Sequence, residues 1–147
     1  MGARRKARKR ALDLLYASEL RREDAAEALD RAIAEGEGPT RDYTATLVRG
    51  VAAQRARIDE LLAGYSQGWS LERMPMVDRN VLRLGAYELL YEPDVPGPVA
   101  VAEAVALVKE LSTDESPAFV NGVLGAILRD RDELVDRSAS SAGTPPE

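Results

Sequence analysis

The amino-acid sequence predicts an all-α fold, a bundle of about seven helices. Among its 147 residues are 23 Ala and 18 Leu but only three Ile and seven aromatic residues. Good helix formers therefore dominate, and residue types that favour strands are scarce. Apolar residues also recur at spacings of three and four along most of the chain, as they do on the buried face of a helix. The length is enough for one domain with its own hydrophobic core.

Capping residues and apolar spacing place the individual helices. Asp24, with Glu27 three residues later, marks one helix start, and Pro75, Pro98 and Pro117 mark others. The predicted segments are 4–21, 24–36, 39–65, a short turn within 64–74, 75–92, 98–111 and 116–137. The longest of them, 39–65, would make about seven turns and serve as a central scaffold. Residues 138–147 are small, polar and rich in Pro, and are predicted to be disordered.

Charge is distributed unevenly along the chain. The first ten residues carry six cations and no acid, namely Arg4, Arg5, Lys6, Arg8, Lys9 and Arg10. The other 137 residues hold 14 basic and 25 acidic side chains, a balance of −11. A basic arm, residues 1–10, thus continues into the first helix of an acidic body. Such an arm is typical of a phosphate-binding surface, although a solvated helix terminus can have the same composition.

The residue types that are missing exclude most catalytic chemistry. The chain has no Cys and no His, which removes thiol nucleophiles, imidazole bases and nearly all transition-metal sites. Only carboxylates remain, with Glu88 and Glu92 four residues apart and Glu103 in an apolar run where burial would raise its pKa. Structural roles for these acids are more common than catalysis. We therefore expect no enzymatic activity, no cofactor and no metal.

The location of the protein is also constrained by the sequence. No apolar stretch approaches the roughly 20 residues of a membrane-spanning helix. The basic start is followed by Asp13 and Glu19, so it lacks the apolar core of a signal peptide. We expect a cytoplasmic protein with no membrane partner.

Two further groups of residues are candidates for binding. Phe119 and Asn121, near the start of the last helix, offer a stacking face and an amide that suit unpaired RNA bases. A purely structural role of Phe119 in the core is the alternative. The second group combines residue types favoured at protein interfaces and consists of Tyr16, Leu20, Asp78, Arg79 and Arg83. Packing and ion pairing explain this group equally well.

Four sequence blocks together resemble the NusB family of transcription antitermination factors. They are RRKARKRALDLLYASEL, LVRGV, VDRNVLRLGAYELLYEPDVP and AVAEAVALVKELSTDESPAFVNGVLGAI. The blocks occur in the family's order and spacing and extend over residues 4–128. The basic arm followed at these distances by the last two blocks is a specific combination.

The resemblance implies a non-enzymatic fold of two small helical subdomains over residues 4–137. NusB-like proteins bind single-stranded boxA RNA together with NusE, a small-subunit ribosomal protein, and help RNA polymerase read through terminators, notably in ribosomal RNA operons. By this resemblance the RNA face comprises Arg4, Arg5, Lys6, Arg8, Lys9, Arg10, Phe119 and Asn121. The NusE-facing surface comprises Tyr16, Leu20 and Asp78, with Arg79 and Arg83 beside them.

Two positions depart from the usual family pattern, and two other functions compete with this one. Ala102 replaces an amide residue, and Pro117-Ala118 stands where many members have a Lys, so we expect one phosphate contact fewer and weak RNA affinity without the protein partner. A self-associating helical module, forming a homodimer, is one alternative. An RNA-targeting module like those attached to ribosomal RNA methyltransferases is the other, and the lack of a second domain in this sequence disfavours it.

Overall fold

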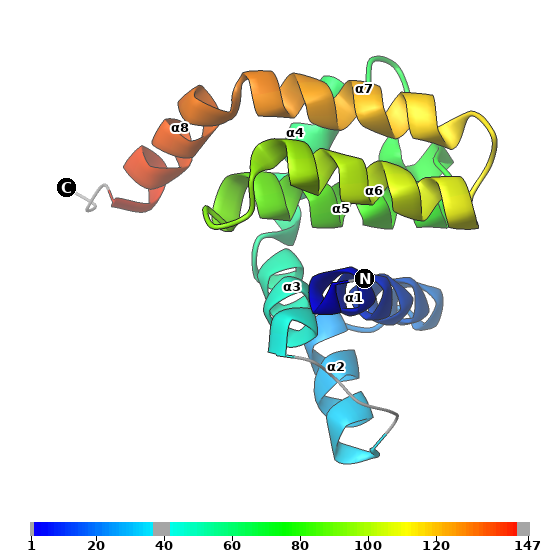
Figure 1. Cartoon of the computed structure of the whole chain (residues 1–147). Helices are drawn as coiled ribbons and strands as arrows, with labels where there is room; N and C mark the ends of the chain where they lie inside the picture. Colours follow the sequence, from blue (N-terminus) through cyan, green and yellow to red (C-terminus); the bar gives the residue numbers. More distant parts are fainter. Residues whose placement is uncertain (1, 37–41, 144–147) are drawn as a thin grey trace.

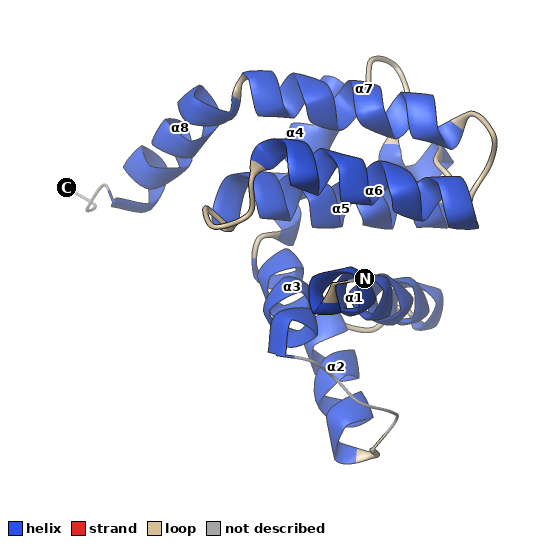
Figure 2. Ribbon diagram, in the orientation of Figure 1, coloured by secondary structure: helices blue, strands red, loops and turns tan. Residues whose placement is uncertain are grey.

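Eight α-helices and one 3₁₀ turn make up the part of the chain that the computed structural model describes, residues 2–36 and 42–143. They are α1 (Ala3–Arg21), α2 (Ala25–Ala34), α3 (Asp42–Ala53), α4 (Arg55–Tyr65), η1 (Leu71–Arg73), α5 (Met76–Tyr91), α6 (Gly97–Leu111), α7 (Ser116–Arg129) and α8 (Arg131–Gly143). No strand occurs in these residues (Figure 2). The all-α prediction is confirmed, and Asp24 caps α2 by accepting the Glu27 N–H at 3.1 Å.

The helices form two groups that meet along α5. Helices α1, α2 and α3 pack together as one group, and α4 to α7 form the other, with α8 extending from its end (Figure 1). Every residue of α5 from Asn80 to Leu90 is buried. The helix contacts α1 and α3 on one side and α4, α6 and α7 on the other. The central scaffold is therefore α5, and not the long helix predicted over 39–65.

That predicted long helix is in fact two helices. Gln54 has φ −105° and ψ 15°, and it separates α3 from α4, while residues 37–41 lie outside the described part. The bend lets α3 pack on α1 and α2 while α4 packs on α5 and α7. Hydrogen bonds from the Gln54 N–H to Gly50 and from the Ile58 N–H to Gln54 continue across it. No Gly or Pro marks the bend, so the apolar pattern runs through it without interruption.

The last predicted helix is also divided. Helix α7 ends at Arg129, and α8 begins at Arg131 after a turn in which the Asp130 N–H bonds to the carbonyls of Ala126 and Ile127. Helix α8 continues to Gly143, which includes six residues of the segment predicted to be disordered. Residues 144–147 lie outside the described part of the chain.

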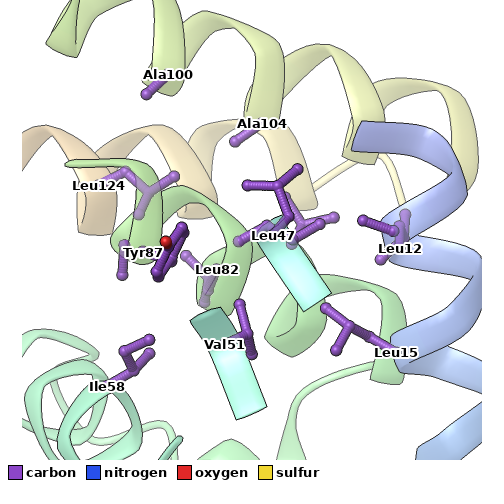
Figure 3. Close-up of a cluster of buried hydrophobic side chains, with 14 of the residues drawn as sticks. Leu12, Leu15, Leu47, Val51, Ile58, Leu82, Tyr87, Ala100, Ala104 and Leu124 are labelled. Carbon is purple, nitrogen blue, oxygen red and sulfur yellow. The ribbon is translucent and has the colours of Figure 1, made fainter. Parts of the chain in front are cut away.

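Buried aliphatic side chains from both helix groups join in one core (Figure 3). Leu15 of α1, Leu47 of α3, Leu82 of α5 and Leu124 of α7 are at most 1% exposed. Helices α3 and α5 approach closely at Gly50, where an added Cβ would lie 2.2 Å from a ring carbon of Tyr87. None of the described helices is long and apolar enough to span a membrane.

Candidate nucleic-acid interface

The basic arm forms the first turns of α1. Arg4, Arg5, Lys6 and Lys9 are exposed there, and Arg10 is partly exposed. The guanidinium carbon of Arg4 lies 4.5 Å from the centre of the Tyr43 ring, which is a cation–π contact between α1 and α3. The arm is thus a helical surface fixed against the body, with several cations facing solvent.

Arg8 differs from its neighbours because it points into the protein. Its side chain donates to Glu88 through Nε to Oε1 at 2.9 Å and Nη2 to Oε2 at 2.8 Å, and Nη1 lies 3.2 Å from Glu103. The Tyr43 hydroxyl donates to Glu88 at 2.5 Å. Burial lowers the pKa of Arg8, but the hydrogen bonds and charge of Glu88 outweigh it, so the pKa is raised.

The expectation that Arg8 contacts phosphate is therefore corrected. The residue is 5% exposed, and two carboxylates already occupy its guanidinium. Arg8 instead fixes the rotation of α1 on α5. The other cations of the arm therefore lie on the side of α1 that faces away from α5.

Two carboxylates of α6 pair with exposed cations of the arm. Arg5 donates to Glu103 through Nε at 3.0 Å and Nη2 at 2.6 Å, and Lys9 Nζ lies 2.6 Å from Glu110. The hydrogen bond from Arg5 lowers the pKa of Glu103 by more than partial burial raises it. Burial alone would raise this pKa, but a partly buried acid paired with arginines is stabilised as the anion, which agrees with the structural role favoured for Glu103.

The two residues expected to read bases lie on α7. Asn121 is exposed, while Phe119 is half-buried and packs partly against the core. The Phe119 ring centre is 5.8 Å from that of Trp69, at an interplanar angle of 43°. Phe119 also lines two surface hollows, so it is both a packing residue and an accessible ring. Sequence reasoning missed Trp69, although a single Trp in a Gly-containing connector was a visible signal.

Asp78, expected at a partner surface, lies inside the protein. It is 3% exposed and accepts hydrogen bonds from Ser112 Oγ at 2.5 Å and Ser116 Oγ at 2.8 Å. It thereby connects α5 to the end of α6 and the start of α7. Ser116, the first residue of α7, donates its hydroxyl to this carboxylate. The prediction that Asp78 is available to a partner is corrected by its burial.

Arg83 is buried as well, and Arg79 is partly buried. Arg79 donates to Glu19 on α1 and to the Met74 carbonyl at 2.9 Å. Arg83 is 4% exposed and donates to Glu19 at 2.9 Å and to Asp59 of α4 at 2.8 Å. Burial raises the pKa of Glu19, but the hydrogen bonds from both arginines outweigh it and lower the pKa to about 2. These arginines join α1, α4 and α5 through their ion pairs with Glu19 and Asp59.

Tyr16 and Leu20 remain exposed as predicted. They lie one turn apart on the second half of α1, with 36% and 61% of their surface accessible. Of the five residues expected at the protein interface, these two are the ones open to solvent. Arg79 and Arg83 hold the same helix through Glu19, whereas Asp78 bonds to Ser112 and Ser116.

Comparison with known proteins identifies the family. The NusB family model matches residues 5–129. A transcription antitermination protein NusB from Nocardioides sp. is 72% identical over 134 residues, covering 91% of this chain and 99% of the relative. The NusB protein of Acidothermus cellulolyticus is 48% identical over 147 residues, with both chains fully covered.

Solved structures agree with the sequence comparison. NusB from T. maritima has a TM-score of 0.77 at 34% identity, covering 90% of this chain and 98% of that one. A crystal structure of the antitermination factors NusB and NusE in complex with dsRNA has a TM-score of 0.74 at 31% identity, covering 86% and 96%. The described helices thus have the arrangement of solved NusB proteins, and this chain belongs to the NusB family.

Proposed function

We propose that this protein is a transcription antitermination factor that binds single-stranded boxA RNA together with NusE. It would act in the cytoplasm with RNA polymerase, notably on ribosomal RNA operons. The observation that carries the proposal is the row of exposed cations on α1, whose orientation is fixed by the buried Arg8–Glu88 pair. Membership of the NusB family supports it, as does the solved complex of relatives with NusE and RNA.

The RNA face would combine two kinds of contact. Arg4, Arg5, Lys6, Lys9 and Arg10 on α1 would neutralise phosphates, which supplies affinity without sequence preference. The aromatic ring of Phe119 and the amide of Asn121 on α7 would contact bases, which supplies selectivity. Both elements meet the end of α6, since Lys9 pairs with Glu110 there and Ser112 is joined through Asp78 to Ser116.

The NusE face would centre on Tyr16 and Leu20. Both side chains are apolar over much of their surface, and Tyr is a frequent anchor of protein interfaces. Glu19 lies between them in sequence and is held by Arg79 and Arg83 on the inner side of α1. Arg79, Arg83 and Asp78 would therefore act by positioning α1 and α7 rather than by touching the partner.

The protein would act by binding and not by catalysis. Each acid considered for catalysis has a structural partner, because Glu88 and Glu103 bond to arginines and Glu92 accepts from Tyr87 at 2.8 Å. Carboxylates paired with arginines, as Glu88 and Glu103 are, are typical of structural ion pairs.

Titration of fluorescent boxA RNA with the protein, alone and with NusE, tests the proposal. A scrambled RNA of equal length is the control. We expect binding that prefers boxA and that NusE strengthens. Equal, weak and salt-sensitive binding to both RNAs would contradict the proposal and leave only a basic helix terminus.

Self-association through the same surface is the competing function, because Tyr16 and Leu20 would be buried in a homodimer. Light scattering over a range of concentrations distinguishes the two. A monomer throughout supports the proposal. A dimer that binds RNA better on dilution, and that Leu20→Asp dissociates, would instead indicate a stored or inhibited state.

A further inference from the structure

Trp69 is a large exposed aromatic residue outside the proposed RNA face. It is the only Trp of the chain, and 52% of its surface is accessible. The two residues before it have positive φ angles, 42° at Gln67 and 89° at Gly68, and the Trp69 N–H donates to the Ser66 carbonyl at 3.2 Å. A left-handed backbone at a residue other than Gly costs free energy and is concentrated at functional sites. This turn holds the Trp69 ring on the surface.

The rings of Trp69 and Phe119 stand between two surface hollows. The larger hollow has a volume of about 630 Å³ and the smaller about 590 Å³, and both residues line both of them. The ring centres are 5.8 Å apart with a 43° angle between the planes, so the rings touch without covering each other's faces. A planar group can therefore stack on either ring from the larger hollow.

The larger hollow has the chemistry of a nucleotide site. Tyr65, Trp69 and Phe119 supply three aromatic rings, and Gln67 supplies an amide at its edge. Arg129 is the one charged residue among the described residues that line it. Aromatic rings with a cation and hydrogen-bonding groups are the combination by which proteins hold unpaired bases.

The smaller hollow is less suited to a polyanion, because Asp78 and Glu115 line it together with Arg73. Gly122, which lines the larger hollow, leaves space there, because a Cβ added at this residue would meet nothing within 4 Å. The difference in charge between the two hollows selects the larger one for an anionic ligand.

The larger hollow continues the proposed RNA face. Lys9 of the arm pairs with Glu110, so the arm reaches the end of α6. The hydrogen bonds of Ser112 and Ser116 to Asp78 join that end to the start of α7, and Phe119 lies one turn further along α7. Phe119, which lines the larger hollow, is thus one turn from a helix end that is joined to α6, the helix that Lys9 contacts.

We propose that Trp69 and Phe119 form a stacking site for an unpaired RNA base in the larger hollow, with Arg129 contacting a phosphate of the same strand. This inference rests on the proposed function and extends it, because it adds Trp69 and Arg129 to the RNA face proposed above. Trp69 supplies stacking area, and Arg129 supplies the charge at the far end of the hollow.

The single Trp makes a direct test possible. The protein is titrated with unlabelled boxA RNA while Trp69 emission is followed, and free tryptophan with the same RNA corrects for absorption. We expect emission to be quenched, with a midpoint that matches the affinity measured from labelled RNA under the same conditions. RNA that binds by the labelled assay while Trp69 emission stays constant would overturn the inference.

Substitutions give a second readout. Trp69→Ala is expected to weaken RNA binding about 5- to 150-fold, the loss of one stacked base, without changing the slope of affinity against salt. Trp69→Phe should recover most of that loss. Arg129→Gln should reduce the salt slope by about 0.7. The matched control is Ile33→Ala on α2, which removes an apolar side chain that is 49% exposed and should leave binding unchanged.

The outcomes separate this inference from the proposed function. Loss of selective boxA binding by the unaltered protein contradicts the proposed function. Selective binding that Trp69→Ala does not weaken overturns only the stacking site. Quenching of Trp69 by NusE and not by RNA also overturns it, because the hollow would then belong to the protein interface.

Discussion

Arg8 of α1 and Glu88 of α5 form a bidentate ion pair, although 80 positions separate them in the sequence. The two side chains are 6% and 2% exposed. A pair this deeply buried is costly to break, because either partner alone would be an uncompensated charge in the core. The pair also decides which cations of the arm face the solvent, and so it links the stability of the fold to the RNA surface.

Removing one member of this pair should destabilise the protein strongly. Arg8→Ala is expected to lower the free energy of unfolding by about 3–5 kcal/mol, measured by urea denaturation. Arg8→Met combined with Glu88→Leu should recover much of the loss, since neither charge then remains buried. Lys6→Ala, an exposed neighbour on the same helix, is the control and should change stability by less than about 0.5 kcal/mol. A small effect of Arg8→Ala would contradict the buried position of the residue.

The salt dependence of RNA binding should follow the exposed cations only. Replacing both Arg4 and Lys6 with Ala is expected to flatten the plot of log affinity against log salt by about 1.4, or 0.7 for each phosphate contact. These substitutions are better than deletion of residues 1–10, which would also remove Arg8 from the core. Arg137→Ala on α8 changes a cation away from the arm and should leave the slope as it was. An unchanged slope in the double variant would place the RNA on another face.

The pairing of Lys9 with Glu110 should weaken RNA binding, because a phosphate must compete with this carboxylate for the ammonium group. Both side chains are about half exposed, so water and salt screen the pair and its contribution is small. Glu110→Gln is expected to raise RNA affinity about 1.5- to 5-fold at low salt, measured by fluorescence anisotropy. Glu60→Gln makes the same change of net charge on α4 and should have no such effect. Equal gains from both substitutions would indicate a general charge effect.

Acid should destabilise the fold through Glu19. The pKa of this residue is about 2 in the folded protein against an ordinary value of 4.5, so the folded state binds the proton less readily. The resulting stabilisation is complete above about pH 5 and is lost as the pH falls toward 2. It amounts to about 2 kcal/mol after allowance for solvent near the carboxylate. The measurement is thermal unfolding between pH 6 and pH 2.5. The Glu19→Gln variant should lose less stability over this range than the unaltered protein. The control Glu60→Gln should lose as much stability as the unaltered protein.

Several elements were predictable because their signals are local. The cap of α2 at Asp24 and the starts of α5, α6 and α7 near Pro75, Pro98 and Pro117 follow from residues at the helix ends themselves. The bend at Gln54 carries no such residue. It arises because α3 and α4 pack on different partners, and a pattern of apolar spacing along one segment does not record which helix each face meets.

The candidate site was predictable only in part, because its burial depends on contacts between residues far apart in the sequence. The exposure of Tyr16, Leu20 and Asn121 agrees with expectation, whereas Arg8, Asp78 and Arg83 are buried by partners far away in sequence. One signal was available for Arg8: it precedes Leu12 and Leu15 by four and seven residues, which is the spacing of a single helix face. The basic composition of residues 1–10 predicts that Arg8 belongs to the RNA-binding arm, whereas its spacing from Leu12 and Leu15 predicts that it faces the core.

The ion pair between Arg8 and Glu88 also constrains how the chain is made. A ribosome adds about 5–20 residues per second, so roughly 4–16 s pass between the synthesis of Arg8 and that of Glu88. During this interval Arg8 has neither of its two carboxylate partners, Glu88 and Glu103. Helix α1 can pack on α2 and α3 before α5 is made, but its ion pair with α5 can form only after Glu88 has left the ribosome.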